Sequence, residues 1–508
     1  MTRKMNILIL MADQMTANAL RIFGNKTTIT PNIDKLAENS VSFSSAYCNS
    51  PLCAPSRFSW MAGRLPSAIG AYDNAAEFSA QIPTFGHYLR RAGYHTVLAG
   101  KMHFCGPDQL HGFEERLTTD IYPADFGWTP DWTRPEHRPS WYHNMDSVIQ
   151  AGPSIRTNQI DFDEEVVFAA RRKLYDLARG PKDRPFCMVM SLTHPHDPFN
   201  ILEKYWARYE GTTIDPPKIA IPTDRLDPHS RRLRHVCAMD QQPVTEQQIL
   251  AARRAYYGAV SYVDDQFGAI LETLRECGFA DDTIVILVSD HGEMLGERGL
   301  WYKMSFFEGA CRIPLLIHAP GQFAPAVRNQ AVSLVDILPT LAELAGDGQA
   351  PGYATPLDGQ SLLPHLSGQG GHDQVIGEYL AEGAIAPIVM LRRGGVKFIH
   401  SPADPDQLYD LATDPDELNN LAHDPDSASR CAEFRAEIGS RWSLDTLKAD
   451  VIANQRQRHL VFDALQRGRQ TPWDYQPIDD ASQKYMRNTM ALDDLEARAR
   501  FPRPGDQR

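Results

Sequence analysis

The sequence lacks features that would assign it to a membrane or to the secretory route. It has no run of about 18 apolar residues, the length that a transmembrane helix needs. Its first residues do not resemble a signal peptide, and its eight cysteines show no paired spacing of the kind found in disulfide frameworks. We therefore expect a cytoplasmic protein with no membrane partner.

Positive charge is also scarce. Lys and Arg number 51 against 64 Asp and Glu, which gives a net charge of −13, and no basic run is long enough to suggest a nucleic-acid groove. We expect no nucleic-acid partner. In such an acidic chain, a local cluster of cationic side chains would indicate a site for an anion.

The chain has the composition of a globular protein. Of its 508 residues, 43% are hydrophobic and 23% are charged, which excludes a largely disordered chain. This length allows one large domain and one small one.

Residues 50–64, Ser-Pro-Leu-Cys-Ala-Pro-Ser-Arg and then Phe-Ser-Trp-Met-Ala-Gly-Arg, organise the candidate site. Pro55 and Gly63 predict a short helix that begins near Ser56 and ends at Gly63. Cys53 would then lie close to a helix N-terminus, where anions are favoured, and Arg57 could hold an anionic group. Cys53 is the candidate nucleophile; the alternative is a buried structural cysteine.

Polar residues follow three apolar segments, at 6–11, 186–192 and 283–289. Buried parallel strands have this pattern, and ligands bind at their carboxyl ends. The residues that follow these segments are Asp13 and Gln14, His194 and His196, and Asp290 and His291. Asp13, Asp290 and His291 predict a metal site, in which carboxylates suit Ca²⁺ and the histidine leaves Mn²⁺ open.

A fourth short strand, at 96–99, ends in Gly-Lys-Met-His. Residues two apart in an extended chain face the same side, so Lys101 and His103 can bring a cation and an acid or base to one site. Residues 105–160 are rich in Trp, Tyr, His and Pro and predict a long ordered loop. Aromatic loops of this kind pack over domains or form cages for quaternary ammonium groups.

The motifs Cys53-x-Pro-Ser-Arg57, Gly-Lys101-x-His103 and Asp358-Gly-x-Ser-Leu occur in an order that resembles the type I sulfatases of the alkaline phosphatase superfamily. The resemblance implies an α/β fold, with a large, mostly parallel sheet flanked by helices and a smaller C-terminal α+β subdomain. We expect a catalytic domain at 1–370, a subdomain with a small antiparallel sheet at 371–440 and an extended tail at 441–508.

The resemblance also implies that a formylglycine-generating or equivalent maturation enzyme oxidises Cys53. Hydrated formylglycine offers two hydroxyls, of which one attacks sulfur and the other later expels sulfate. One divalent metal would bind Asp13, position 53, Asp290 and His291. Gln14 would bind it weakly or not at all, because typical sulfatases have two consecutive aspartates where this chain has Asp-Gln, and Asp-Asn where it has Asp-His.

Roles for other residues follow from the same resemblance. Arg57, Lys101 and Lys303 would stabilise charge on the sulfate oxygens. His194 would assist the leaving alcohol, with His196 packed against it, and His103 would take a proton from the second hydroxyl. Asn74 could donate to a substrate oxygen; as an asparagine in a turn it needs no such role.

The aromatic loop and the Trp-Asp-Tyr-Gln-Pro stretch at 473–477 resemble the choline sulfatases. This implies choline O-sulfate as substrate, with Trp128 preferred over Trp132 and Trp141 as the contact of the trimethylammonium head. Glu382 is preferred over Glu378 as its counter-ion, because Glu378 is expected within a strand.

We expect the tail to cross to a neighbouring subunit of a dimer or tetramer, which could bring Asp493 or Asp494 near a choline site. The alternative is a tail folded on its own domain.

The sequence thus predicts a sulfuric ester hydrolase that cleaves choline O-sulfate to choline and sulfate. One alternative is a phosphonate monoester or phosphodiester hydrolase of the same superfamily. Another is a non-catalytic binder of quaternary ammonium compounds in which Cys53 stays unmodified.

Overall fold

A large mixed sheet forms the centre of the protein in a computed structural model that describes residues 4–346, 348–478, 485 and 489–502. Its eight strands lie in the order β12-β2-β11-β9-β1-β7-β4-β5. The strands are β1 (Asn6–Ala12), β2 (Val41–Phe43), β4 (His95–Gly100), β5 (Glu115–Arg116), β7 (Phe186–Ser191), β9 (Thr283–Ser289), β11 (Leu315–His318) and β12 (Ala326–Arg328). The run from β9 to β5 is parallel, whereas β11 is antiparallel to both its neighbours.

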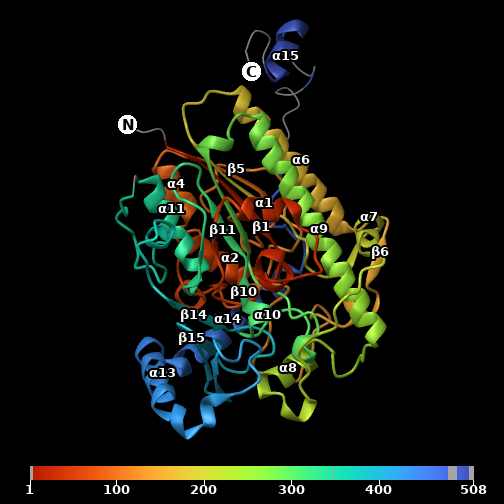
Figure 1. Cartoon of the computed structure of the whole chain (residues 1–508), viewed down its shortest axis with the longest axis vertical. Coiled ribbons are helices and arrows are strands. Elements are labelled where there is room, and N and C mark those ends of the chain that lie inside the picture. The colour runs from red at the N-terminus through yellow and green to blue at the C-terminus, as the bar shows by residue number, and fades with distance from the viewer. Residues whose placement is uncertain (1–3, 347, 479–484, 486–488, 503–508) are drawn as a thin grey trace.

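Helices cover both faces of this sheet (Figure 1). On one side lie α1 (Pro31–Ala37), α6 (Asn158–Arg179) and α9 (Glu246–Glu276), and on the other α4 (Phe85–Arg91) and α11 (Ile337–Ala345). Every residue of β1 is buried, as expected of a parallel strand covered on both faces. Within the described part of the chain, no helix is both long and apolar enough to cross a bilayer.

A smaller antiparallel sheet lies at the lower end of the molecule in Figure 1. Its strands are β14 (Gln374–Tyr379), β15 (Ile388–Arg393), β16 (Val396–Ser401) and β17 (Asp404–Asp410), in that order. Helix α13 (Ala428–Arg441) packs on it through Phe434 and Ile438, which share a small core with strand residues. The predicted α/β fold with a smaller C-terminal sheet is confirmed, and Glu378 lies in a strand as expected. The domain boundaries near 370 and 440 stay a prediction.

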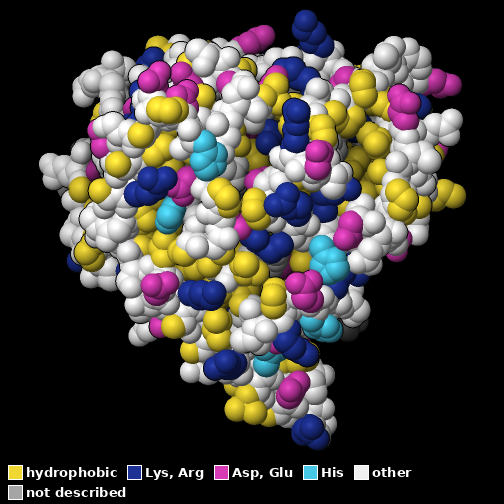
Figure 2. Space-filling model, turned by 90° about the horizontal axis from the view of Figure 1, so that it is seen from below, with side chains coloured by type: hydrophobic (Ala, Val, Ile, Leu, Met, Phe, Trp, Pro, Cys, Tyr) yellow, Lys and Arg dark blue, Asp and Glu magenta, His cyan; other side chains and the backbone are white. Residues whose placement is uncertain are grey.

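Two further helices follow the small sheet. Helix α14 (Leu444–Leu465) packs through Leu447 and Val451 against the core around the large sheet. Helix α15 (Leu492–Ala499) lies at the opposite end of the molecule from the small sheet (Figure 1). The face opposite α15, seen from below in Figure 2, has basic and acidic side chains interspersed rather than gathered by sign.

Candidate active site

The carboxyl ends of neighbouring parallel strands bring the predicted polar residues together. Asp13 follows β1, Lys101 follows β4, and Asp290 and His291 follow β9. Cys53, which is 1% exposed, lies among them. Its Sγ is 3.2 Å from His291 Nε2, 3.6 Å from Lys101 Nζ and 3.8 Å from an Asp13 carboxylate oxygen.

Cys53 is the first residue of helix α2 (Cys53–Ala62). The sequence predicted a start near Ser56; this was wrong by three residues, because Pro55 is tolerated anywhere in a first turn, whose N–H groups have no helical partner. The predicted end is confirmed: Gly63 follows with a φ of 63°. The Ser56 hydroxyl donates to the carbonyl of Asp290 (2.5 Å), which ties the first turn of α2 to the end of β9.

Buried cations neutralise the carboxylates of this cluster. Arg57 Nε donates to Asp290 (2.8 Å), and Lys101 Nζ forms an ion pair with Asp13. Burial alone would raise the pKa of Asp13, but the cationic side chains of Lys101 and Arg57 hold it well below its usual value. Asp13 is therefore an ionised carboxylate at neutral pH.

Four side chains of the cluster can bind one metal ion. Asp13, Cys53, Asp290 and His291 each offer a ligand atom, all within 4.8 Å of one another. Burial lowers the pKa of His291, so its imidazole is neutral, as a metal ligand must be. Two carboxylates and an imidazole fit a divalent cation such as Ca²⁺ or Mn²⁺.

Gln14 directs its side chain to a neighbouring set of residues. Its Oε1 accepts from Lys303 Nζ (2.6 Å), and its Nε2 donates to Asp197 (3.3 Å) and to Glu293. Only its backbone N–H reaches the cluster, where it donates to Asp290 (3.0 Å). Weak metal ligation by Gln14 stays a prediction, but in this structure both ends of its amide are engaged elsewhere.

The two histidines after β7 point in different directions. His194 Nδ1 pairs with Asp163 (2.7 Å), and its ring packs against Tyr262, under helices α6 and α9. His196 Nε2 instead lies 2.8 Å from Lys303 Nζ. The structure therefore brings His196, rather than the predicted His194, to the cluster. The sequence signal was the His-Pro-His triplet, in which either histidine could face the site.

His103 is buried beside the cluster without a hydrogen-bond partner for either ring nitrogen among the described residues. Asp120 accepts from the backbone N–H groups of Met102 (3.0 Å) and His103 (2.9 Å). These bonds hold His103 at a φ of 60°, which is unusual for a residue with a side chain. Burial, reinforced by Lys101, lowers the pKa of His103, so the ring is neutral at pH 7.

Aromatic rings form a wall next to His103. The ring of Trp128 lies 5.7 Å from that of His103, 5.1 Å from that of Tyr122 and 6.3 Å from that of Trp141. Trp128 and Tyr122 belong to residues 120–132, which we call the aromatic segment. Sequence reasoning missed Tyr122, whose ring lies 4.2 Å from Lys101 Nζ; the density of aromatic residues was the available signal.

Glu382 is buried near this wall and lacks a cationic partner. It lines a cavity of about 370 Å³ together with Trp132 and Tyr142, and the ring of Tyr142 lies 4.4 Å from that of Trp141. Within the described ranges, no basic side chain forms an ion pair with Glu382. Burial raises its pKa to about 7.

Glu378, the alternative to Glu382, is engaged elsewhere. It accepts from the Ser67 hydroxyl and from the Trp442 indole, each at 2.6 Å. These two bonds satisfy it as a structural carboxylate between the small sheet and the large domain.

Asn74, Asp493 and Asp494 occupy different places. Asn74 Oδ1 accepts from the N–H of Ala54 (3.0 Å), so its carbonyl oxygen supports the first turn of α2. Asp493 and Asp494 are exposed on α15, at the far end of the same chain from the small sheet (Figure 1). Contacts of all three with substrate stay predictions.

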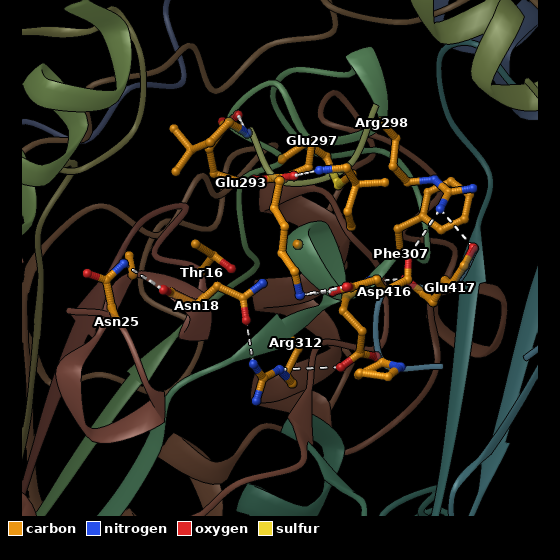
Figure 3. A pocket seen from close by; sticks show the side chains of 18 of the residues that line it. Thr16, Asn18, Asn25, Glu293, Glu297, Arg298, Phe307, Arg312, Asp416 and Glu417 are labelled. Carbon is orange, nitrogen blue, oxygen red and sulfur yellow. Dashed lines mark hydrogen bonds and ion pairs between the residues drawn. The ribbon is translucent and has the colours of Figure 1, made fainter. Parts of the chain in front are cut away.

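A second cavity, of about 570 Å³, is lined by charges of both signs (Figure 3). Arg312 is 3.3 Å from Glu308, and Lys218 is 2.6 Å from Asp416. Glu293 lines this cavity and also accepts from Gln14. One residue of the cavity lining thus contacts the side chain of Gln14, and the charges named here are paired with each other.

Comparison with known proteins defines the class. Residues 5–347 match the family model described as Sulfatase. Residues 296–441 match the C-terminal region of N-sulphoglucosamine sulphohydrolase. The chain belongs to the sulfatase family and is a sulfuric ester hydrolase, as predicted.

The similarity extends to particular relatives. The chain is 48% identical over 510 residues to the choline-sulfatase of Rhizobium meliloti (strain 1021), covering 99% of each. Residues 449–501 match the model described as choline sulfatase enzyme C terminal.

Solved structures support the same fold. The phosphonate monoester hydrolase of Agrobacterium radiobacter aligns with a TM-score of 0.68 at 25% identity, over 88% of this chain and 96% of that one. The structure of BT4656, solved in complex with D-glucosamine-2-N,6-O-disulfate, aligns with a TM-score of 0.66 at 22% identity, over 90% of this chain and 99% of that one.

Proposed function

We propose that this sulfatase cleaves choline O-sulfate to choline and sulfate, with formylglycine made from Cys53 by a maturation enzyme. The observation that carries the choline assignment is the unpaired, buried carboxylate of Glu382, close to aromatic side chains. A quaternary ammonium ion is attracted both by aromatic faces and by a carboxylate. Full-length similarity to a choline-sulfatase and the matching C-terminal model support the assignment.

Asp13, Asp290, His291 and position 53 would hold one divalent metal, Ca²⁺ or Mn²⁺. When bound, the metal would act as a Lewis acid that polarises oxygen at this site. Formylglycine would supply the hydrated aldehyde whose hydroxyl attacks sulfur. The chain's own residues then have to position the ester, stabilise its oxygens and move protons.

Arg57, Lys101 and Lys303 supply positive charge to the sulfate oxygens. All three are buried, and each is held by a bond to another side chain, so little reorganisation is needed as negative charge develops. In the unmodified chain, burial would lower the pKa of Lys303, but Cys53, Asp197 and Asp13 raise it above its usual value. Lys303 is therefore an ammonium at neutral pH.

The departing choline oxygen needs a proton, and Lys303 with His196 can provide it. Burial, with Lys303, holds the pKa of His196 well below its usual value. Neutral His196 donates from Nδ1 to the Asp197 carbonyl (2.6 Å) and accepts from Lys303 at Nε2 (2.8 Å). The proton thus resides on Lys303 Nζ. We assign the leaving-group role to this pair in place of His194.

His103 fits the role of the base that assists sulfate release. Its neutral ring has no hydrogen-bond partner among the described residues, so a ring nitrogen is available to accept a proton. Asp120 fixes the backbone at this residue and so limits where the ring can point.

The choline head would lie between Trp128 and Glu382, next to Trp141. In this proposal the protein acts in the cytoplasm as a homodimer or homotetramer. The tail of a neighbouring subunit would bring Asp493 or Asp494 to the head group.

Steady-state kinetics test the assignment. We expect kcat/KM for choline O-sulfate to exceed that for 4-nitrophenyl sulfate and for phenyl phosphonate monoesters. Equal or higher values for the phosphonate would instead support the phosphonate monoester hydrolase reading. Mass spectrometry of the peptide that contains residue 53 tests the modification. If active protein contains only unmodified Cys53, the proposed formylglycine is contradicted.

A further inference from the structure

Helix α14 and the residues after it hold the aromatic segment along its length. Three contacts connect the aromatic segment to this region. The backbone N–H of Ala124 donates to Asp474 (3.2 Å), and the backbone N–H of Trp132 donates to the Gln455 side chain (2.9 Å). The rings of Phe126 and Trp473 lie 5.2 Å apart. These partners belong to the region that matches the choline sulfatase C-terminal model. The C-terminal region therefore supports the segment that carries Trp128 within the same chain.

Arg458 makes the most extensive of these contacts. It is 4% exposed, and its two terminal nitrogens donate to the two carboxylate oxygens of Asp73, each at 2.6 Å. Nη1 also donates to the hydroxyl of Thr129 (3.1 Å), and Nε donates to Asn454 (2.7 Å). A guanidinium can make this bidentate set of bonds, whereas an ammonium acts as a point charge.

Two of the partners of Arg458, Asp73 and Thr129, belong to different parts of the site. Asp73 precedes Asn74, whose carbonyl oxygen accepts from the N–H of Ala54, next to Cys53 in the first turn of α2. Thr129 follows Trp128, and its hydroxyl donates to the Phe126 carbonyl (2.8 Å). One buried side chain thus joins the turn that supports the nucleophile to the segment that carries the aromatic wall.

We propose that Arg458 is a positioning residue that determines specificity by fixing the aromatic wall at a set distance from residue 53. Choline O-sulfate is short and must place its ammonium group at the wall and its sulfur at residue 53 at the same time. A sulfate ester without a cation needs only the second placement. The inference rests on the proposed choline function.

The best test keeps the buried charge, because removing it would leave Asp73 unpaired and destabilise the fold. Arg458→Lys keeps the charge and loses the bidentate bonds. Thr129→Val removes the bond from Arg458 to the aromatic segment, together with the bond from the Thr129 hydroxyl to the Phe126 carbonyl, and leaves the pairing of Arg458 with Asp73 intact. Arg184→Lys is the control: Arg184 is also bidentate, to Glu114 at 2.6 and 3.2 Å, but it is exposed and precedes β7, at the amino ends of the strands and so away from the cluster.

For each variant, kcat and KM would be measured for choline O-sulfate and for 4-nitrophenyl sulfate, with thermal unfolding alongside. The readout is kcat/KM for choline O-sulfate divided by kcat/KM for 4-nitrophenyl sulfate. Because displacements of about 1 Å cost up to about 100-fold in rate, we expect Arg458→Lys to lower the ratio by about 10-fold or more. We expect at least about 3-fold for Thr129→Val, in line with the loss of two neutral or charge-assisted hydrogen bonds, and a change below about 2-fold for Arg184→Lys.

An unchanged ratio in both Arg458→Lys and Thr129→Val overturns the inference, even if both variants unfold at lower temperature. An equal loss on both substrates also overturns it, because that is the result of a purely structural role. If Arg458→Lys does not fold, the ratio in Thr129→Val decides alone. Failure of the proposed function is separate, since wild-type enzyme would then show no preference for choline O-sulfate before any variant is compared.

Discussion

In the cluster around Cys53 buried charges of opposite sign lie in contact, as in the 2.8 Å bond between Arg57 and Asp290. Near the aromatic wall, the carboxylate of Glu382 has no ion-pair partner among the described residues. The difference shows what each region requires from a ligand. The cluster is already balanced and can respond to charge that develops during the reaction, whereas the ionised form of Glu382 gains an opposite charge beside it when a cation binds.

The two regions are also supported differently. The cluster depends on the ends of β1, β4 and β9 and on the first turn of α2. The aromatic segment has no strand or helix of its own and depends on α14 and the residues after it. A substitution can therefore affect one region without the other, and the following predictions use that independence.

Cys53→Ala is expected to give the largest difference between an effect on turnover and an effect on choline affinity. Without residue 53 as nucleophile, turnover of choline O-sulfate should fall by at least about 1,000-fold. Affinity for choline should change little, because Glu382 and the aromatic wall are intact. Calorimetric titration with choline, beside the kinetic assay, checks both parts. Loss of choline affinity in this variant would show that the two regions are not independent.

The next largest effect compares the two histidines after β7. His196→Gln removes the imidazole that accepts from Lys303 Nζ and leaves the bond from Lys303 to Gln14, so kcat should fall by about 100-fold or more, the usual range for a proton-transfer group. His194→Gln should affect mainly stability, because His194 is paired with Asp163 under α6. Kinetics and thermal unfolding of both variants give the comparison. A larger loss of kcat in His194→Gln would return the role to that residue.

Glu382→Gln should act on the aromatic region alone. Removing the counter-ion of a buried cation costs about 1.5–3 kcal/mol, so KM for choline O-sulfate should rise by about 10- to 100-fold. KM for 4-nitrophenyl sulfate should not change. The matched variant is Glu378→Gln, whose carboxylate binds Ser67 and Trp442 and should influence stability rather than KM.

The pH dependence gives a second readout for Glu382. Burial raises its pKa to about 7 in the free protein, and only the ionised carboxylate attracts a cation. Choline affinity of wild-type protein should therefore fall as pH decreases through about 7, and binding should lower the pKa of the group. In Glu382→Gln the affinity should be nearly independent of pH over this range. Titrations with choline from pH 5.5 to 8.5 measure both curves, and a parallel pH dependence in the variant would exclude Glu382 as the titrating group.

Much of the cluster was predictable because its residues directly follow apolar strands or belong to short motifs. Asp13, Cys53, Lys101 and Asp290 are all of this kind, and the structure brings them together. His196 was not chosen over His194 because both follow the same strand, and the partners that orient the two rings, Asp163 and Lys303, are distant in the sequence. Arg458 was not found because Asp73 and Thr129 become its neighbours only through folding.

The smallest expected effect is a change in KM on substitution of Trp128, which distinguishes it from Trp132 in the aromatic segment. Trp128 lies beside His103 and Tyr122, whereas the indole of Trp132 donates to the Ala381 carbonyl (3.0 Å) and is buried. A cation over an aromatic face gains about 0.5–2 kcal/mol, so Trp128→Leu should raise KM for choline O-sulfate by about 3- to 30-fold. Trp132→Phe should lower the unfolding temperature with less change in KM, because it leaves the Ala381 carbonyl without a partner. If Trp132→Phe raises KM more than Trp128→Leu does, the trimethylammonium head binds in the cavity lined by Glu382 and Trp132 rather than beside Trp128.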